Sequence, residues 1–213
     1  MAKVRTRTLK KVTGGNFRLS ADDHAFLTDL QRVRIIAETD ANNTHYSNRK
    51  TTASKRLNKL VEAGLLKKLE ITVPGQGVLG AYSFADEHVA AKYSSKMPNI
   101  SRMRNGHHEL IVSRLFFAEG RPDTFKIEAD FCDADMEVFR RAGESVSEMA
   151  TPDAMYLSVH GEPVVIEADS GQYNSTQIKN KVSAWAGFKQ VWGQPRVRKS
   201  AVENYCDAVV HRF

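Results

Sequence analysis

The first part of the chain shows two different spacings of hydrophobic residues. Between residues 20 and 34 and again between 51 and 63, apolar side chains recur every three or four positions, which predicts two amphipathic helices. Gly64 follows the second helix and suits a left-handed C-terminal cap. Two extended segments, 65–73 and 78–84, then flank a Pro–Gly turn and predict a hairpin. Helix, turn, helix and hairpin in this order are typical of a winged helix-turn-helix.

The second half of the chain predicts a helix, three strands and another helix. The expected elements are a helix over 108–117, strands over 125–131, 154–159 and 164–168, and an amphipathic helix over 174–191. Residues 193–213 carry no pattern that assigns them. The predicted fold class is α/β in the broad sense, more narrowly α+β, with four parts: a basic arm over 1–18, a winged helix over 19–95, a linker over 96–106 and a second domain over 107–213.

Charge is distributed unequally along the chain. Residues 1–104 carry 19 Lys and Arg against 9 Asp and Glu, whereas residues 105–213 carry 12 against 16. A basic half favours binding to a polyanion, and an acidic half favours clustered carboxylates. Cys132 and Cys206 lie far apart, which argues against a disulfide framework or a zinc ribbon. Since no apolar run approaches the ~20 residues that cross a bilayer and no secretory signal is visible, we expect a cytoplasmic protein.

The helix expected over 51–63 carries the candidate contacts to double-stranded DNA. A helix in the major groove brings its N-terminal residues close to base edges and phosphates. The residues of this kind here are Arg49, Lys50, Thr51, Thr52, Ser54, Lys55, Arg56 and Lys59. A winged helix that contacts another protein is the alternative, although the net positive charge favours DNA. The basic arm adds phosphate or minor-groove contacts, or is a solvated tail.

Three acidic residues flank the hairpin expected over 154–168. Asp153 precedes its first strand, and Glu167 and Asp169 lie at the end of its second strand. With a turn at 160–163, opposite residues have numbers summing to about 321 to 323, which places Asp153 within one or two positions of both acids. Glu167 and Asp169 share a face because strand side chains alternate. Such carboxylates repel one another unless they bind a cation, and oxygen ligands suit Mg²⁺ or Mn²⁺.

Lys181 lies on the helix expected after this hairpin, with Gln177 one turn earlier on the same side. An ammonium group in this place can stabilise a pentavalent phosphate or orient an attacking water, while a metal ion polarises the phosphate. Strand-edge acids and a helix lysine also form ordinary surface ion pairs, which is the structural alternative. The candidate catalytic residues are Asp153, Glu167, Asp169, Lys181 and Gln177.

The stretch PDAMYLSVHGEPVVIEADSGQYNSTQIKNKV, residues 152–182, resembles the PD-(D/E)xK nuclease superfamily. More narrowly, it resembles the plasmid replication-relaxation proteins and the related MOB-C class of mobilisation relaxases. In those families a winged helix precedes a nuclease-like core, Glu-x-Asp replaces Glu-x-Lys, and the lysine is displaced to the next helix. Residues 49–71 similarly resemble the recognition helix and first wing strand of winged-helix regulators, and residues 108–112 resemble the histidine-led first helix of the relaxases. The resemblance covers residues 19–192.

This resemblance implies a restriction-endonuclease-like core, with a mixed sheet flanked by helices. It implies a relaxase that nicks plasmid DNA at a transfer origin during mobilisation, with accessory mobilisation proteins as candidate partners. Asp153 and Glu167 would be ligands of Mg²⁺ or Mn²⁺, Asp169 a further acidic ligand or orienting group, and Lys181 the catalytic cation.

Two other functions are weighed against this one. The first is a non-catalytic DNA-binding regulator of plasmid replication or transfer that keeps a nuclease-like domain without turnover. The second is a tyrosine relaxase with a two-histidine metal site, which needs a His-x-His cluster that none of the seven histidines forms. A covalent step through Tyr156, Tyr173 or Tyr205 is left open by the sequence, as are the DNA target and the oligomeric state.

Overall fold

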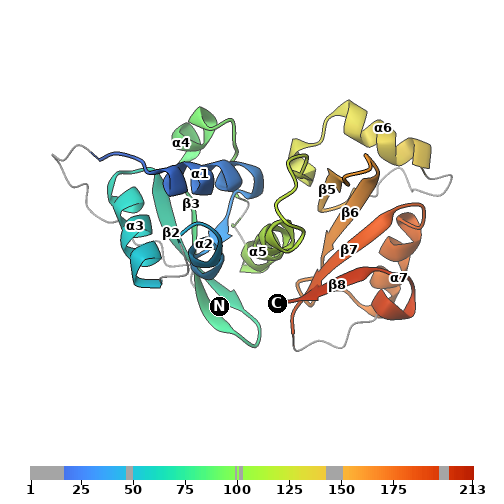
Figure 1. Ribbon diagram of the computed structural model, residues 1–213. Coiled ribbons are helices and arrows are strands. Elements are labelled where there is room, and N and C mark those ends of the chain that lie inside the picture. Colours follow the sequence, from blue (N-terminus) through green and yellow to red (C-terminus); the bar gives the residue numbers. More distant parts are fainter. Residues whose placement is uncertain (1–16, 47–49, 99, 101–102, 143–150, 197–201) are drawn as a thin grey trace. The chain divides into compact units, whose positions relative to one another are not determined.

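The chain divides into two compact units, Met1–Ser113 and Arg114–Phe213, each with its own sheet (Figure 1). The computed structural model describes residues 17–46, 50–98, 100, 103–142, 151–196 and 202–213. The division falls within helix α5 (Met103–Ala118), later in the chain than the expected linker over 96–106. The expected mixture of helices and sheets is confirmed. Within the described ranges, none of the helices combines the length and apolar character that a membrane crossing requires.

The first unit contains both helices and the hairpin that the sequence predicts. Its three-stranded antiparallel sheet has the order β1-β3-β2, and the hairpin pairs Leu66 with Phe84 and Val73 with Gly77. Gly64, at φ +74°, adopts the left-handed conformation expected after the second helix. In chain order the elements are α1 (Ala21–Val33), β1 (Ile36–Ala37), α2 (Glu38–Thr44), α3 (Lys50–Glu62), β2 (Leu66–Val73), β3 (Gly77–Phe84) and α4 (Glu87–Lys92).

Helix α2 lies in a stretch that has no hydrophobic period. Its sequence is ETDANNT, and Ala41 is its one buried residue. A helix that buries so little apolar surface cannot be detected from periodicity, so its formation depends on the neighbouring elements. The core of this unit is built from the expected stripes, with Phe26, Leu27 and Leu30 on α1 and Ala53, Leu57 and Leu60 on α3 all buried.

The second unit has a five-stranded mixed sheet in the order β4-β5-β6-β7-β8. Strands β4, β5 and β6 are antiparallel neighbours, whereas β6, β7 and β8 run parallel. After α5 the elements are β4 (Lys126–Ile127), a 3₁₀ helix (Glu128–Asp130), α6 (Asp133–Ala142), β5 (Ala154–Leu157), β6 (Pro163–Ala168), α7 (Ser175–Ala184), β7 (Lys189–Gln194), a 3₁₀ helix (Val202–Asn204) and β8 (Val209–Arg212).

Two sequence predictions for this unit are wrong. The strand expected over 125–131 is two residues long, because a 3₁₀ turn replaces it from Glu128. The helix expected over 174–191 ends at Ala184, and β7 begins at Lys189. Val191 and Trp192 continue the apolar spacing of α7, but they belong to strand β7. Because β7 is buried on both faces, its residues do not alternate between apolar and polar, and the sequence pattern does not reveal a strand.

Candidate carboxylate–lysine site and nucleic-acid interface

The β5–β6 hairpin brings Asp153 close to Glu167. Ala154 pairs with Ile166 and Leu157 with Pro163, so partner numbers sum to 320, one less than the expected range. Asp153 and Glu167 are the next residues beyond the Ala154–Ile166 pair. The half-buried Asp153 accepts a hydrogen bond at Oδ2 from the Ala168 N–H at 2.7 Å. Its carboxylate is therefore held against the end of β6.

Glu167 is fully buried and paired with two side chains of the α7 region. The Lys181 Nζ donates to Glu167 Oε2 at 2.6 Å, and the Trp185 Nε1 donates to Oε1 at 2.7 Å. Lys181 and Trp185 are four residues apart, which places them on the same side of a helix. The expected proximity of Asp153, Glu167 and Lys181 is found, with Trp185 as an additional member that the sequence analysis did not assign to the site.

The charges of this group perturb one another. Burial and the charge of Asp153 raise the pKa of Glu167, whereas Lys181 and Trp185 lower it, and the net value is about 8. Burial alone would lower the pKa of Lys181, but the charges of Glu167 and Asp153 raise it above its ordinary value. Two carboxylates and one amine therefore form one electrostatic cluster, which we call the Asp153–Glu167–Lys181 cluster.

Asp169 contacts a different set of groups. Its Oδ1 accepts from the backbone N–H of Gly171 at 2.8 Å and of Tyr173 at 3.4 Å, and its Oδ2 accepts from Gln194 Nε2 at 3.3 Å. Strand β6 ends at Ala168, so Asp169 begins a loop whose backbone it binds, as Asp residues commonly do in turns. In the part of the chain that the structure describes, no three His, Cys, Asp or Glu residues form a group that could hold a metal ion.

Gln177 caps helix α7. Its Oε1 accepts from the Asn174 N–H at 2.9 Å, and its own N–H donates to Asn174 Oδ1 at 2.9 Å. This reciprocal pair is a capping box, which satisfies backbone donors at the first turn of a helix. The exposed Gln177 side chain thus has a structural explanation that does not require catalysis.

Tyr173, in the loop between β6 and α7, is adjacent to the cluster. The Lys181 Nζ lies 5.4 Å from the centre of its ring. Burial and the negative charge of Asp153 raise the pKa of Tyr173, against the opposing effect of Lys181. From the sequence, Tyr173 is one of three candidate tyrosines, and its position between Asp169 and Lys181 is the signal that could have selected it.

Asp153 and Glu167 could together bind a magnesium or manganese ion. Mg²⁺ in proteins is commonly held by one or two carboxylates, with water and phosphate oxygens completing its coordination. Each oxygen of Glu167 already accepts one hydrogen bond, and a carboxylate oxygen has a second lone pair. The donor set therefore fits a two-carboxylate site rather than the expected three-carboxylate site.

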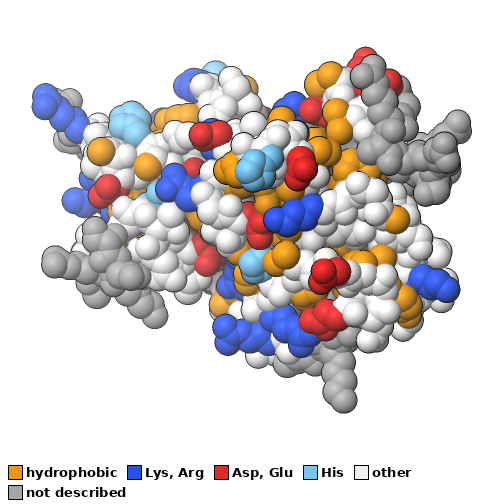
Figure 2. Space-filling model, turned by 45° about the vertical axis from the view of Figure 1, so that its right-hand side comes forward, with side chains coloured by type: hydrophobic (Ala, Val, Ile, Leu, Met, Phe, Trp, Pro, Cys, Tyr) orange, Lys and Arg blue, Asp and Glu red, His pale blue; other side chains and the backbone are white. Residues whose placement is uncertain are grey.

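In the first unit, the candidate DNA contacts of α3 fall into different environments. Thr52, Lys55 and Lys59 are exposed, whereas Ser54 is half-buried. Arg49 and the side chains of Lys50 and Thr51 lie outside the described residues. On the face shown in Figure 2, acidic and basic side chains are interspersed, so on that face charge alone does not outline an interface.

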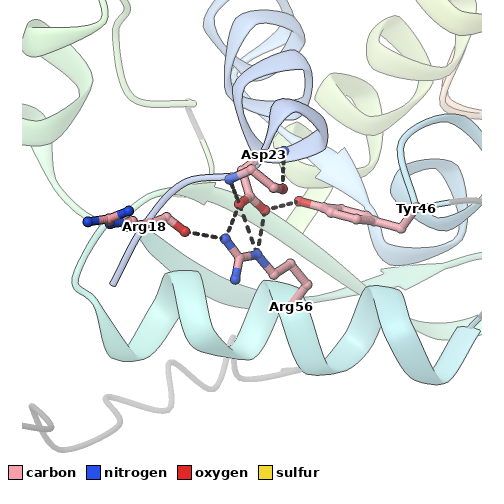
Figure 3. A network of polar contacts seen from close by, with 5 residues as sticks. Arg18, Asp23, Tyr46 and Arg56 are labelled. Atoms are coloured by element: carbon pink, nitrogen blue, oxygen red, sulfur yellow. Dashed lines mark hydrogen bonds and ion pairs between the residues drawn. The ribbon is translucent and has the colours of Figure 1, made fainter. Parts of the chain in front are cut away.

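Arg56 is engaged within the fold. Its Nε donates to both carboxylate oxygens of Asp23, at 2.9 and 2.8 Å, and its Nη2 donates to Asp23 and to the Arg18 carbonyl oxygen at 2.6 Å (Figure 3). The guanidinium lies 4.7 Å from the centre of the Phe17 ring. The Tyr46 hydroxyl donates to Asp23 Oδ1 at 3.1 Å. Arg56 thus joins α3 to the start of α1, which is a different role from the expected contact with DNA.

Comparisons with protein-family models, with curated proteins and with solved structures found no match to this chain.

Proposed function

We propose that this chain is a DNA-nicking endonuclease of the plasmid mobilisation relaxase kind. The first unit would bind double-stranded DNA at a plasmid transfer or replication origin, and the second would cleave a phosphodiester with Mg²⁺ or Mn²⁺. The observation that carries the proposal is the convergence of Asp153, Glu167 and Lys181 at the end of the β5–β6 hairpin. Perturbed titratable groups with specific charge partners are characteristic of functional sites.

The first unit supports the DNA-binding part of this proposal. Its elements follow the order helix, strand, helix, helix and hairpin, and the short β1 pairs with β3 as in a winged helix. Helix α3 would be the recognition helix, with Thr52, Lys55 and Lys59 as its exposed donors. Lysine contacts of this kind bind phosphate and provide affinity rather than sequence specificity.

The second unit supports the nuclease-like part. After β4, a 3₁₀ helix and α6, the chain continues as β5, β6, α7 and β7. Strands β4, β5 and β6 are antiparallel neighbours and β7 is parallel to β6, and the cluster lies where β6 leads into α7. This arrangement agrees with the restriction-endonuclease-like core that the resemblance implies. The displaced lysine of that resemblance corresponds to Lys181, which reaches Glu167 from α7.

The residues of the cluster have separate tasks in this mechanism. Asp153 and Glu167 would hold the divalent ion, which supplies Lewis-acid polarisation of the phosphate and activation of water. Lys181, whose side chain is 28% exposed, would bind a phosphate oxygen and stabilise the negative charge that builds up during cleavage. Trp185 keeps the Glu167 carboxylate in one orientation through its Nε1 hydrogen bond.

The direct test is nicking of a supercoiled plasmid that carries the cognate origin, in the presence of Mg²⁺ or Mn²⁺. We expect Asp153→Asn and Glu167→Gln to reduce nicking at least about a hundredfold, because each removes a carboxyl ligand of the metal ion. Glu162→Gln, at an exposed position in the β5–β6 turn, is the matched control and should nick like the wild type. Unchanged nicking in both site variants would refute the catalytic assignment.

A second candidate is a DNA-binding regulator without nuclease turnover. The observation that favours it is that both oxygens of Glu167 already accept hydrogen bonds within the fold. Such a protein would bind origin DNA and leave it intact with either metal ion, and Asp153→Asn would not change its affinity.

A further inference from the structure

We infer that Tyr173 contacts the DNA phosphate together with Lys181, and that Asp169 is the positioning residue that holds Tyr173 in place. The inference rests on the proposed function in one respect: a phosphodiester must bind at Lys181. It assigns a role to a tyrosine outside the expected catalytic set, and it replaces the expected role of Asp169 as a metal ligand.

The position of the Tyr173 side chain is determined by hydrophobic packing. The residue packs against a buried cluster formed by Ile178, Val182, Trp192 and Val202. This packing leaves the ring next to the ammonium group of Lys181, 5.4 Å from the ring centre. A phenol anchored by its ring presents its hydroxyl with little loss of conformational entropy when a ligand binds.

The hydrogen-bond chemistry of this pair suits an anion. An ammonium group can only donate, and a phenol O–H donates to an oxygen acceptor. A phosphate oxygen is such an acceptor. Lys181 and Tyr173 together would offer one charged and one neutral donor to the same phosphate group, which is a stronger site than Lys181 alone.

The other two tyrosines considered from the sequence are placed differently. The Tyr156 hydroxyl donates to Glu119 Oε2 at 2.5 Å, away from the cluster. Tyr205 follows the 3₁₀ helix Val202–Asn204 and is 40% exposed. Of the three, Tyr173 is the one whose ring lies beside a member of the Asp153–Glu167–Lys181 cluster.

Asp169 explains why the loop keeps Tyr173 at this place. Its carboxylate binds the backbone N–H groups of Gly171 and Tyr173, and Gln194 on β7 binds its second oxygen. Asp169 is fully buried, and its N–H donates to the Gly193 carbonyl at 2.9 Å. The loop is therefore attached to the sheet through one side chain, and Asp169 acts on the phosphate through Tyr173.

The experiment measures binding of thymidylyl-thymidine, the smallest DNA phosphodiester, to the full chain in EDTA. The NMR signal of the Lys181 side chain, assigned by its loss in Lys181→Arg, reports the titration. We expect Tyr173→Phe, which keeps the ring, to bind about tenfold more weakly than the matched control Tyr156→Phe. Equal affinities of the two variants, or no shift of the Lys181 signal in the wild type, would overturn the inference.

Two variants of Asp169 distinguish a role in positioning Tyr173 from a role as a metal ligand. Asparagine retains a carbonyl oxygen that can accept from the loop N–H groups, whereas alanine does not. We expect Asp169→Ala to weaken dinucleotide binding as much as Tyr173→Phe, and Asp169→Asn to restore both this binding and Mg²⁺-dependent nicking to within about threefold of wild type. Loss of nicking in Asp169→Asn with dinucleotide binding intact would show that Asp169 is a metal ligand, contrary to the inference.

Plasmid nicking by the same proteins distinguishes the two proposals. Tyr173-dependent dinucleotide binding without nicking by the wild type would support the inference and exclude the nuclease function. Nicking by the wild type, with equal dinucleotide binding by Tyr173→Phe and Tyr156→Phe, would support the nuclease and exclude the inference.

Discussion

Each unit contains a fully buried carboxylate paired with a cation from a helix, and the two pairs differ in their electrostatics. Asp23 is bound by Arg56 of α3, and Glu167 by Lys181 of α7. Burial raises the pKa of Asp23, but hydrogen bonds from Arg56 and Ser20 outweigh it and lower the pKa below its ordinary value. For Glu167, burial and the charge of Asp153 outweigh Lys181, and the pKa is raised.

The difference distinguishes a structural pair from a candidate functional one. The planar guanidinium of Arg56 donates hydrogen bonds to both oxygens of the Asp23 carboxylate. The backbone N–H of Ser20 donates a further hydrogen bond to the same carboxylate. Lys181 brings one compact positive charge to Glu167, which has the carboxylate of Asp153 beside it. The negative charge of the cluster is therefore not fully compensated. A cluster of this kind gains stabilisation when a cation binds to its carboxylates or an anion binds to its ammonium group.

The largest expected effect on stability belongs to the Asp23–Arg56 pair. We expect Arg56→Ala to lower the free energy of unfolding of the first unit by about 3 kcal/mol, because it leaves a buried carboxylate without its main partner. Denaturant unfolding measures the change, and the exposed neighbour Lys55→Ala is the control, with an expected change within about 0.5 kcal/mol. Similar small losses in both variants would mean that the pair is not a structural clamp.

A smaller effect is expected from the pH dependence of Glu167. Because its folded-state pKa is raised from 4.5 to about 8, the folded state keeps a proton that the unfolded state has lost over this interval. Its contribution to stability therefore decreases as pH rises through the window. Glu167→Gln should flatten the pH dependence of the unfolding free energy, and Glu162→Gln should not. Parallel curves for the wild type and Glu167→Gln would contradict the raised pKa.

The smallest expected effect concerns contacts of α3 with DNA. We expect Lys55→Ala to weaken DNA binding and to reduce the slope of log affinity against log salt by about 1, because one phosphate contact is lost. Lys92→Ala, at the exposed end of α4, is the control and should leave the slope unchanged. Fluorescence anisotropy at several salt concentrations measures both. An unchanged slope in Lys55→Ala would favour a protein partner for the first unit.

Local patterns predicted the elements that bury one face. Helices α1 and α3 and the β2–β3 hairpin follow from their apolar spacing, and Gly64 follows α3. Strand β7 could not be predicted, because it is buried on both faces, and β8 lies in a stretch that carried no assignment. Both strands pair in parallel with residues far along the chain, and no local pattern encodes such pairing.

The sequence alone determined which residues could meet at the site: a short hairpin turn sets the strand register to within one residue, and this places Asp153 beside Glu167. Tertiary structure alone decided the roles of Asp169, Gln177 and Arg56. A carboxylate, an amide or a guanidinium binds whichever partner the fold places within about 3 Å, and these partners are a loop backbone, a helix cap and a buried aspartate. Chemical type limits what a side chain can do, but only its three-dimensional neighbours determine what it does.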